Sequence, residues 1–203
     1  MKLIDINNSG QRWFASVAVA ISLLAIGGDN LAQLLAYHRD YISSGEFWRL
    51  LTGHLVHSNT WHYLLNLASL LFIGALFGQL LSGAVWATAF VFCGLSISGI
   101  YWFFAPGFTS YVGLSAVLYG VIIIGAIQDL PKNKLIAIAL IIIVTGRVIW
   151  QQFDGASESL TELVENRVAI ESHLFGIITG YLFSLLLFLK NVLNKGDSPP
   201  PPN

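Results

Sequence analysis

The sequence contains few charged residues: Asp, Glu, Lys and Arg make up 10% of its 203 residues, whereas hydrophobic residues make up 55%. Charged residues account for about a quarter of a typical soluble domain, so this shortage excludes that class. The mean hydropathy of +0.70 agrees. A net charge of −1 lacks the basic excess of nucleic-acid-binding proteins, and we expect no nucleic-acid partner. The composition predicts an integral membrane protein with the lipid bilayer as its partner.

The sequence also contains only one cysteine, Cys93. An intrachain disulfide needs two, so none is expected, and cysteine usage does not indicate a redox compartment. Cys93 lies inside an apolar run, where a thiol usually packs as a small hydrophobic side chain. No motif implies a metal or an organic cofactor, and we expect none.

Six apolar stretches run along the chain, each near the length of a membrane span, which needs about 20 apolar residues. They are residues 13–28, 60–81, 84–105, 112–128, 133–151 and 169–189. Six spans leave no room for a separate soluble domain. We therefore predict an all-α polytopic membrane protein with a single six-helix domain over residues 1–197. Residues 198–203 are rich in proline and are expected to form a disordered tail.

Residues 29–59, between the first two stretches, are too polar to span a membrane. They mix apolar residues with charged ones such as Arg39, Asp40 and Glu46. We expect this segment to lie in the outer interface, with Trp48 as an aromatic anchor.

The orientation follows from Lys and Arg, because cytoplasmic loops carry an excess of both. With both termini in the cytoplasm, six of the ten lie inside and four outside. The inner ones are Lys2, Arg12, Lys132, Lys134, Lys190 and Lys195, and the outer ones are Arg39, Arg49, Arg147 and Arg167. The second, fourth and sixth stretches then run from outside to inside.

These three stretches carry polar side chains near their outer ends. His62 and Asn66 open the second, Ser115 opens the fourth and His173 opens the sixth. At 1.5 Å per residue, all four lie within about 10 Å of the outer interface. Polar groups inside a bilayer are costly and are usually functional. Their common depth predicts one hydrolytic site inside the membrane.

Ser115 is the candidate nucleophile and His173 its candidate base, because a serine hydroxyl reacts only when a base within about 2.6–3.2 Å takes its proton. The alternative for a serine in a membrane helix is packing or a bond to its own backbone. His62 and Asn66, an i, i+4 pair, can donate with the backbone N–H of Ser115 to an oxyanion. Glu171 faces another side of the helix from His173, which favours a dyad over a triad.

Small residues flank both candidates, and this pattern lets two helix backbones approach closely. They are Gly113, Ala116 and Gly120 on the fourth stretch and Gly176 and Gly180 on the sixth. Such packing suits a catalytic contact and ordinary helix association equally. Tyr119, four residues after Ser115, is placed to support the His173 ring or to fill the core as a simple aromatic.

A zinc site is the competing interpretation of His54, His57 and His62. No carboxylate is spaced to complete it and Cys93 is remote, so we do not expect a metal. His57 alternatively pins the interfacial segment. Arg147, near the outer end of its stretch, is expected to extend toward the interface.

In these residues the chain resembles the rhomboid family of intramembrane serine proteases. The shared elements, in the order of the family, are Trp48-Arg49, His57, His62 with Asn66, Gly113-Leu114-Ser115-Ala116 with Tyr119, and Ser172-His173 followed by Gly176 and Gly180. The resemblance covers about residues 45–190 and implies a rhomboid-like helical bundle with an interfacial first loop. It implies that Ser115 is the nucleophile and His173 the base. It also implies that His62, Asn66 and the Ser115 backbone form the oxyanion hole. The same resemblance implies that Tyr119 stacks on His173 and that Trp48 and Arg49 anchor the first loop. Ala116 departs from the usual second glycine.

The run over residues 45–57 and the compact form look most like the rhombosortase subgroup. That similarity implies a bacterial inner membrane, with the active site open to the periplasm. It also implies membrane-anchored protein substrates that carry a C-terminal Gly-Gly motif, a helix and a basic end. Two rivals remain: an inactive rhomboid-like protein that binds membrane helices, and a small transporter, which would need polar residues through the full membrane depth.

Overall fold

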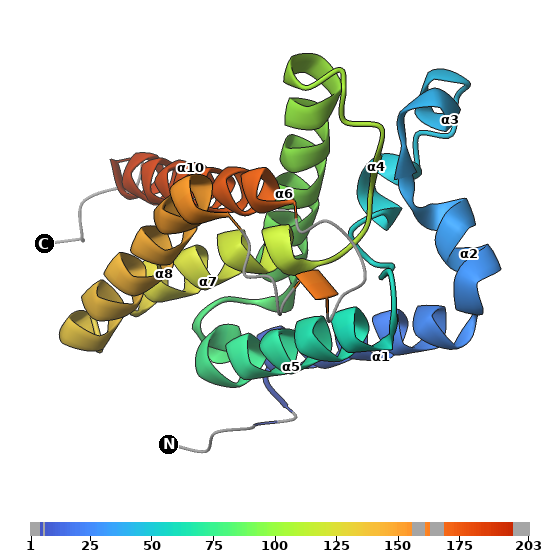
Figure 1. Ribbon diagram of the computed structural model, residues 1–203. Coiled ribbons are helices and arrows are strands. Elements are labelled where there is room, and N and C mark those ends of the chain that lie inside the picture. The colour runs from blue at the N-terminus through green and yellow to red at the C-terminus, as the bar shows by residue number, and fades with distance from the viewer. Residues whose placement is uncertain (1–4, 6, 156–160, 163–168, 197–203) are drawn as a thin grey trace, which may run out of the picture.

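The structure of the protein is a computed structural model that describes residues 5, 7–155, 161–162 and 169–196. The longer helices are α1 (Ser9–Ile26), α5 (Thr60–Phe77), α6 (Gly83–Phe104), α7 (Ser115–Asp129), α8 (Lys134–Asp154) and α10 (Ile170–Gly196). The shorter elements are α2 (Gly28–Leu35), α3 (Arg39–Ser43), α4 (Arg49–Thr52), the 3-10 helix η1 (Gly78–Leu80) and the strands β1 (Tyr37–His38) and β2 (Ser110–Tyr111). Figure 1 shows α2, α3 and α4 together at one end of the helical bundle. The predicted tail at 198–203 lies outside the described residues.

Within the described residues, five helices are long and apolar enough to cross a membrane, as in a multi-pass helical membrane protein. They span Ser9–Ile26, Thr60–Leu80, Gly83–Phe104, Lys134–Asp154 and Ile170–Asn194. The remaining predicted span corresponds to α7, which is apolar but has only 15 residues. The number six therefore stays a prediction.

Two predicted helix starts were wrong for reasons of backbone geometry. The first helix begins at Ser9, not at 13, because the side chain of Asn8 caps it by accepting from the backbone N–H groups of Gly10 and Gln11. The fourth helix begins at Ser115, not at 112, because Gly113 has a φ of +118°, which no α-helix allows.

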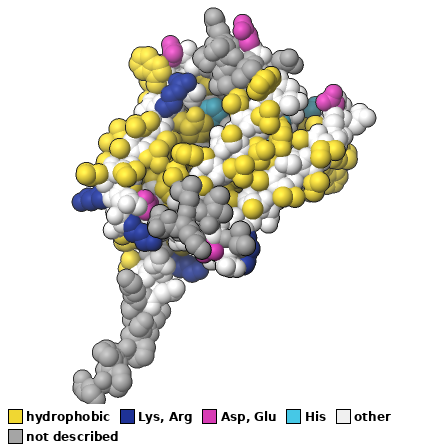
Figure 2. Space-filling view, turned by 90° about the horizontal axis from the view of Figure 1, so that it is seen from below, with side chains coloured by type: hydrophobic (Ala, Val, Ile, Leu, Met, Phe, Trp, Pro, Cys, Tyr) yellow, Lys and Arg dark blue, Asp and Glu magenta, His cyan; other side chains and the backbone are white. Residues whose placement is uncertain are grey.

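The outer surface of the bundle is a belt of apolar side chains. Large hydrophobic residues such as Leu23, Phe72, Ile142 and Phe188 are mostly exposed. Figure 2 shows this belt across one face, with charged side chains gathered toward its two ends. An apolar surface of this extent suits lipid rather than water.

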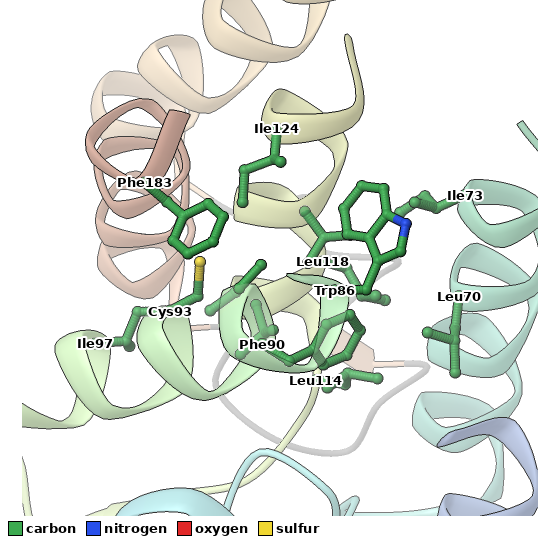
Figure 3. Packing of buried hydrophobic residues seen from close by; sticks show 14 of the residues in the cluster. Leu70, Ile73, Trp86, Phe90, Cys93, Ile97, Leu114, Leu118, Ile124 and Phe183 are labelled. Carbon is green, nitrogen blue, oxygen red and sulfur yellow. The ribbon is translucent and has the colours of Figure 1, made fainter. Parts of the chain in front are cut away.

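Helix α7 lies at the centre of the bundle and packs against α5, α6, α8 and α10. Most of its residues are buried, including Ala116, Val121 and Ile124. Figure 3 shows the core around it, with Trp86 and Phe90 of α6 and Phe183 of α10 among the rings that fill the space. Cys93 lies in this core as a free, buried thiol, which confirms its prediction as a small hydrophobic residue.

The close approach predicted between the fourth and sixth stretches is confirmed. A Cβ at Gly176 would overlap the carbonyl oxygen of Ala116, and a Cβ at Gly180 would meet the carbonyl oxygen of Gly120. The backbones of α7 and α10 are therefore in direct contact, and Ala116 is fully buried beside it.

The polar segment before α5 forms a small structured cap. Arg49 is its central side chain: Nη1 donates to the carbonyl oxygens of Gln33 and Ala36 at 2.7 and 2.8 Å, and Nε donates to Glu46 at 2.6 Å. Trp48 beside it is 49% exposed. These bonds fold the segment back on itself and link the C-terminal end of α2 to α4.

This cap also holds the chain that leads into α7. Strand β1 pairs antiparallel with β2, with Tyr37 opposite Tyr111. The N–H of Gly113 donates to the carbonyl oxygen of Gly53 at 3.0 Å, and the hydroxyl of Tyr111 donates to the carbonyl oxygen of Gly113 at 2.7 Å. The backbone immediately before Ser115 is thereby fixed from two sides.

Candidate active site

The predicted nucleophile and base lie in hydrogen-bond contact. Ser115 is the first residue of α7 and His173 lies in the first turn of α10, and the close packing of these helices places Ser115 Oγ 3.1 Å from His173 Nε2. The imidazole is almost fully enclosed, with 5% of the residue exposed. An unprotonated Nε2 at this distance can accept the hydroxyl proton.

Gly113 brings the histidine of the second stretch against the loop before Ser115. A Cβ at Gly113 would lie 2.6 Å from both Nε2 and Cε1 of His62. Because its φ of +118° also suits only glycine, position 113 excludes a side chain for two separate reasons. The edge of the His62 ring that carries Nε2 therefore packs on the backbone two residues before the predicted nucleophile.

His62 and Asn66 are positioned by the start of α5. Asn59 caps this helix, its side chain accepting from the backbone N–H of His62 at 2.8 Å. Nδ1 of His62 is 3.0 Å from Ser58 Oγ. Asn66, one turn later and 4% exposed, donates from Nδ2 to the carbonyl oxygen of His62 at 2.8 Å. The pair thus presents two donor-bearing side chains on the face that turns toward α7.

The N-terminus of α7 adds backbone donors. The first N–H groups of a helix have no partner inside it, and they carry a partial positive charge. Ser115 opens α7, so its own N–H is one of them. A negative charge that develops near Ser115 Oγ is favoured by this helix end as well as by the nearby side chains.

A cavity of about 1150 Å³ connects these groups. The predicted site residues on its wall are Arg49, His62, Asn66, Ser115, Tyr119 and His173. Its deeper part is apolar, formed by Ile73, Leu118, Ile122 and Val144. The volume accommodates several residues of an extended peptide, with apolar side chains below and the serine above.

Tyr119 contacts His173, but the two rings are not parallel. Their centroids are 4.6 Å apart and their planes are inclined by 44°. The tyrosine therefore limits the movement of the imidazole as a tilted neighbour, whereas the resemblance implied a stack.

Two other histidines lie outside this wall. His57 packs edge-on against His62, with ring centroids 5.1 Å apart. His54 is enclosed beside α6, with Nε2 3.0 Å from both the Gly94 carbonyl oxygen and Ser98 Oγ. Burial lowers the pKa of His54 to about 4 and, with the nearby His62, that of His57 to about 3. Both are neutral at pH 7 and serve packing.

A metal centre finds no support in the part of the chain that the structure describes. Within it, no three His, Cys, Asp or Glu side chains lie close enough to hold a metal ion. The zinc interpretation of His54, His57 and His62 therefore lacks a ligand set.

Sequence reasoning missed polar neighbours of the site, among them Gln151. Its Oε1 lies 3.2 Å from Nδ1 of His173, on the side of the ring away from Ser115. The available signal was its position: Gln151 ends the apolar stretch 133–151 at the same outer level as His173.

Comparison with known proteins identifies the family. Residues 44–190 match the family model described as the Rhomboid domain, which covers most of the chain and all of the residues above. A search of curated proteins gives no significant match.

Proposed function

Because the chain belongs to the rhomboid family, whose members are generally intramembrane serine proteases, we propose that it is an intramembrane serine endopeptidase. The observation that carries the proposal is the 3.1 Å contact between Ser115 Oγ and His173 Nε2 inside a cavity. Ser115 is the nucleophile and His173 the general base, and no cofactor takes part.

The reaction proceeds through an acyl-enzyme. Nε2 of His173 takes the hydroxyl proton as Ser115 Oγ bonds to the substrate carbonyl carbon, whose oxygen becomes negative. The imidazolium then gives this proton to the departing amine nitrogen, and the C–N bond breaks. Water attacks the ester in the second half, again losing its proton to Nε2, and the serine hydroxyl is restored with release of the new carboxyl terminus.

The oxyanion is stabilised by His62, Asn66 and the N–H of Ser115. A hydroxyl proton donated by Ser58 to Nδ1 of His62 leaves the ring proton on Nε2, the nitrogen beside Gly113. Preorganised donors of this kind each contribute about 10²–10³ in rate. The N-terminus of α7 adds its dipole.

The substrates are membrane-anchored proteins cut near the outer interface. The apolar lower wall of the cavity suits a segment that enters from lipid. A helical substrate hides its carbonyl groups in i→i−4 bonds and must unwind first, so glycine near the cut lowers the cost. We place the chain in the rhombosortase subgroup, by the similarity at 45–57, with substrates that end in Gly-Gly, a helix and a basic tail.

The topology that accompanies this activity has six spans, with α7 as the fourth. Both termini then lie in the cytoplasm, and the site opens to the periplasmic side of a bacterial inner membrane. Support comes from His62, Ser115 and His173, which all lie at the beginnings of helices. These helices, α5, α7 and α10, all run from right to left in Figure 1.

An inactive helix-binding protein and a transporter are less well supported. The dyad and the predicted donors are intact, which an inactive relative does not require. A transporter needs a polar path across the membrane, yet Ile123, Ile124 and Ala126 in the inner half of α7 are fully buried among apolar neighbours.

Co-expression with a tagged membrane substrate ending in Gly-Gly, a helix and a basic tail tests the proposal. The wild type should cleave it, and Ser115→Ala and His173→Ala should not. Ser184→Ala is the matched control, because in the described part of the chain the hydroxyl of this buried serine donates within its own helix, to the carbonyl oxygen of Gly180. A fluorophosphonate probe separates the questions: labelling of Ser115 without cleavage would reject the substrate alone, and equal cleavage by all variants would reject the dyad.

A further inference from the structure

His173 has a second hydrogen-bond partner besides Ser115. Oε1 of Gln151, in the last turn of α8, lies 3.2 Å from its Nδ1. Both residues are buried, with 2% of Gln151 and 5% of His173 exposed. Within the described part of the chain, the hydrogen bonds of this imidazole go to these two side chains, one on each nitrogen.

The chemistry of the two partners decides where the imidazole proton lies. An amide oxygen can only accept, so the bond to Gln151 requires a proton on Nδ1. A neutral imidazole carries one proton, and Nε2 is then left with its lone pair toward Ser115 Oγ, 3.1 Å away. The opposite tautomer would place an N–H on the serine side and leave the amide oxygen without a donor.

We propose that Gln151 is a positioning residue of the protease: it holds His173 in the tautomer and orientation in which Nε2 accepts the proton of Ser115. The inference rests on the proposed function and extends it from a dyad to a Ser-His-Gln relay of hydrogen bonds. Gln151 contacts no reacting atom in this arrangement and acts through His173 alone. The aspartate of serine protease triads has the same orienting effect.

A neutral amide suits this position better than a carboxylate. An ionised side chain buried at membrane depth carries a large desolvation cost unless it is paired. Besides Ser115 and Gln151, the described groups of other helices that act on His173 are Tyr119 of α7, by ring contact, and His62 of α5 and Arg147 of α8, electrostatically. An amide fixes the ring beside them without adding a permanent charge.

The adjacent Gln152 provides a matched control. Its Nε2 donates to the carbonyl oxygen of Ile170 at 3.0 Å, so it also ties α8 to α10, but it does not bond His173. Gln→Met at either position keeps the chain length and removes the amide. A loss common to both variants reports on helix packing, whereas a loss confined to position 151 reports on His173.

The first readout is the kinetics of fluorophosphonate labelling at Ser115 in purified full-length protein. Gln151→Met should lower the maximal labelling rate about 10–100-fold, while the half-saturating probe concentration stays unchanged. Removal of the hydrogen-bond partners of metal-ligating histidines has effects of this size. Gln152→Met should label like the wild type. Gln151→Glu, which keeps an acceptor oxygen but adds the desolvation cost of a buried charge, should label faster than Gln151→Met and more slowly than the wild type.

The second readout is independent of activity. In protein labelled with ¹⁵N-histidine, with His173→Ala to assign the signals, the wild type should show His173 protonated on Nδ1, and Gln151→Met should show a mixture of tautomers. An Nε2-protonated His173 in the wild type would overturn the proposal, as would labelling of Gln151→Met at the wild-type rate, or equal losses in both methionine variants. If the wild type fails to label, the assignment as a protease is wrong, and the tautomer measurement still tests whether Gln151 sets the tautomer of His173.

Discussion

Replacing Gly113 by alanine is the sharpest perturbation that the structure offers. The new Cβ would lie 2.6 Å from Nε2 of His62, whereas nonbonded heavy atoms prefer about 3.5–4.0 Å. The His62 ring or the backbone before Ser115 must therefore move by about 1 Å. Displacements of this size between reacting groups can reduce rates about 10²-fold, so we expect Gly113→Ala to lower the rate of Ser115 labelling by that factor.

The same substitution also forces a non-glycine residue into a φ of +118°, and this effect must be separated from the first. Gly45→Ala provides the control: its φ is +105°, and its new Cβ would meet no atom within 4 Å. Each variant should lose roughly 1–3 kcal/mol of stability from backbone strain. The loss of rate should occur in Gly113→Ala alone.

The assay combines thermal unfolding in detergent with the kinetics of fluorophosphonate labelling. Both alanine variants should unfold at a lower temperature than the wild type, and only the variant at 113 should label slowly. If Gly113→Ala labels as fast as Gly45→Ala, the His62 ring does not depend on this contact, and its assignment to the oxyanion hole is wrong.

Two further predictions concern helix packing and pH. Gly176→Val should abolish labelling and cleavage, because the valine side chain would overlap the Ala116 carbonyl oxygen and separate α10 from α7. Gly146→Val is the control and should stay active, because its Cβ would meet open space. Comparable activity in the two variants would refute this prediction. Burial lowers the pKa of His54 from 6.5 to about 4, so the unfolded chain binds a proton more readily than the folded chain. As the pH decreases from 6.5 to about 4, the free energy of unfolding should therefore fall, by up to about 1.4 kcal/mol per pH unit. The unfolding temperature, measured from about pH 7 to about pH 5, should fall less steeply in His54→Gln, and an unchanged slope would exclude this histidine as a cause.

The apolar helices were predictable because the length of an apolar run can be counted directly in the sequence. The helices α5, α6 and α8 begin within one residue of the predicted stretches. The errors occur where the backbone departs from what the side chains indicate. Val112 and Gly113 look like part of an apolar span, but the chain there is a strand end followed by a left-handed glycine.

The site was predictable to the extent that depth alone defines it. Counting residues from the outer interface selected His62, Asn66, Ser115 and His173, and all four lie on the wall of one cavity. Depth does not reveal which way a side chain points around its helix. The contact of Gln151 with His173 depends on how α8 is rotated about its axis relative to α10. A single sequence does not indicate this rotation.

The interfacial cap was the least predictable part, although the position of the nucleophile depends on it. Strands β1 and β2 have two residues each and lie far apart in the sequence, so no periodicity marks them. Their pairing, the bond from Gly113 to Gly53 and the bonds of Arg49 satisfy backbone groups that would otherwise be unpaired near the membrane surface.

The shortness of α7 follows from the same need to satisfy backbone N–H and carbonyl groups. Its 15 residues extend about 22 Å, roughly 8 Å less than the 30 Å hydrocarbon core. Non-helical backbone is tolerated at membrane depth only where protein buries it or where it lines a wet cavity. The residues before Ser115 meet that condition, because β1 and Gly53 bond them from one side and the cavity opens on the other. A full-length helix would carry its first N–H groups to the interface, where bulk water competes for any oxyanion. In the proposed topology, the late start of α7 keeps its N-terminus and Ser115 below the interface, at the level of His62 and His173, where the donors act in a less polar medium.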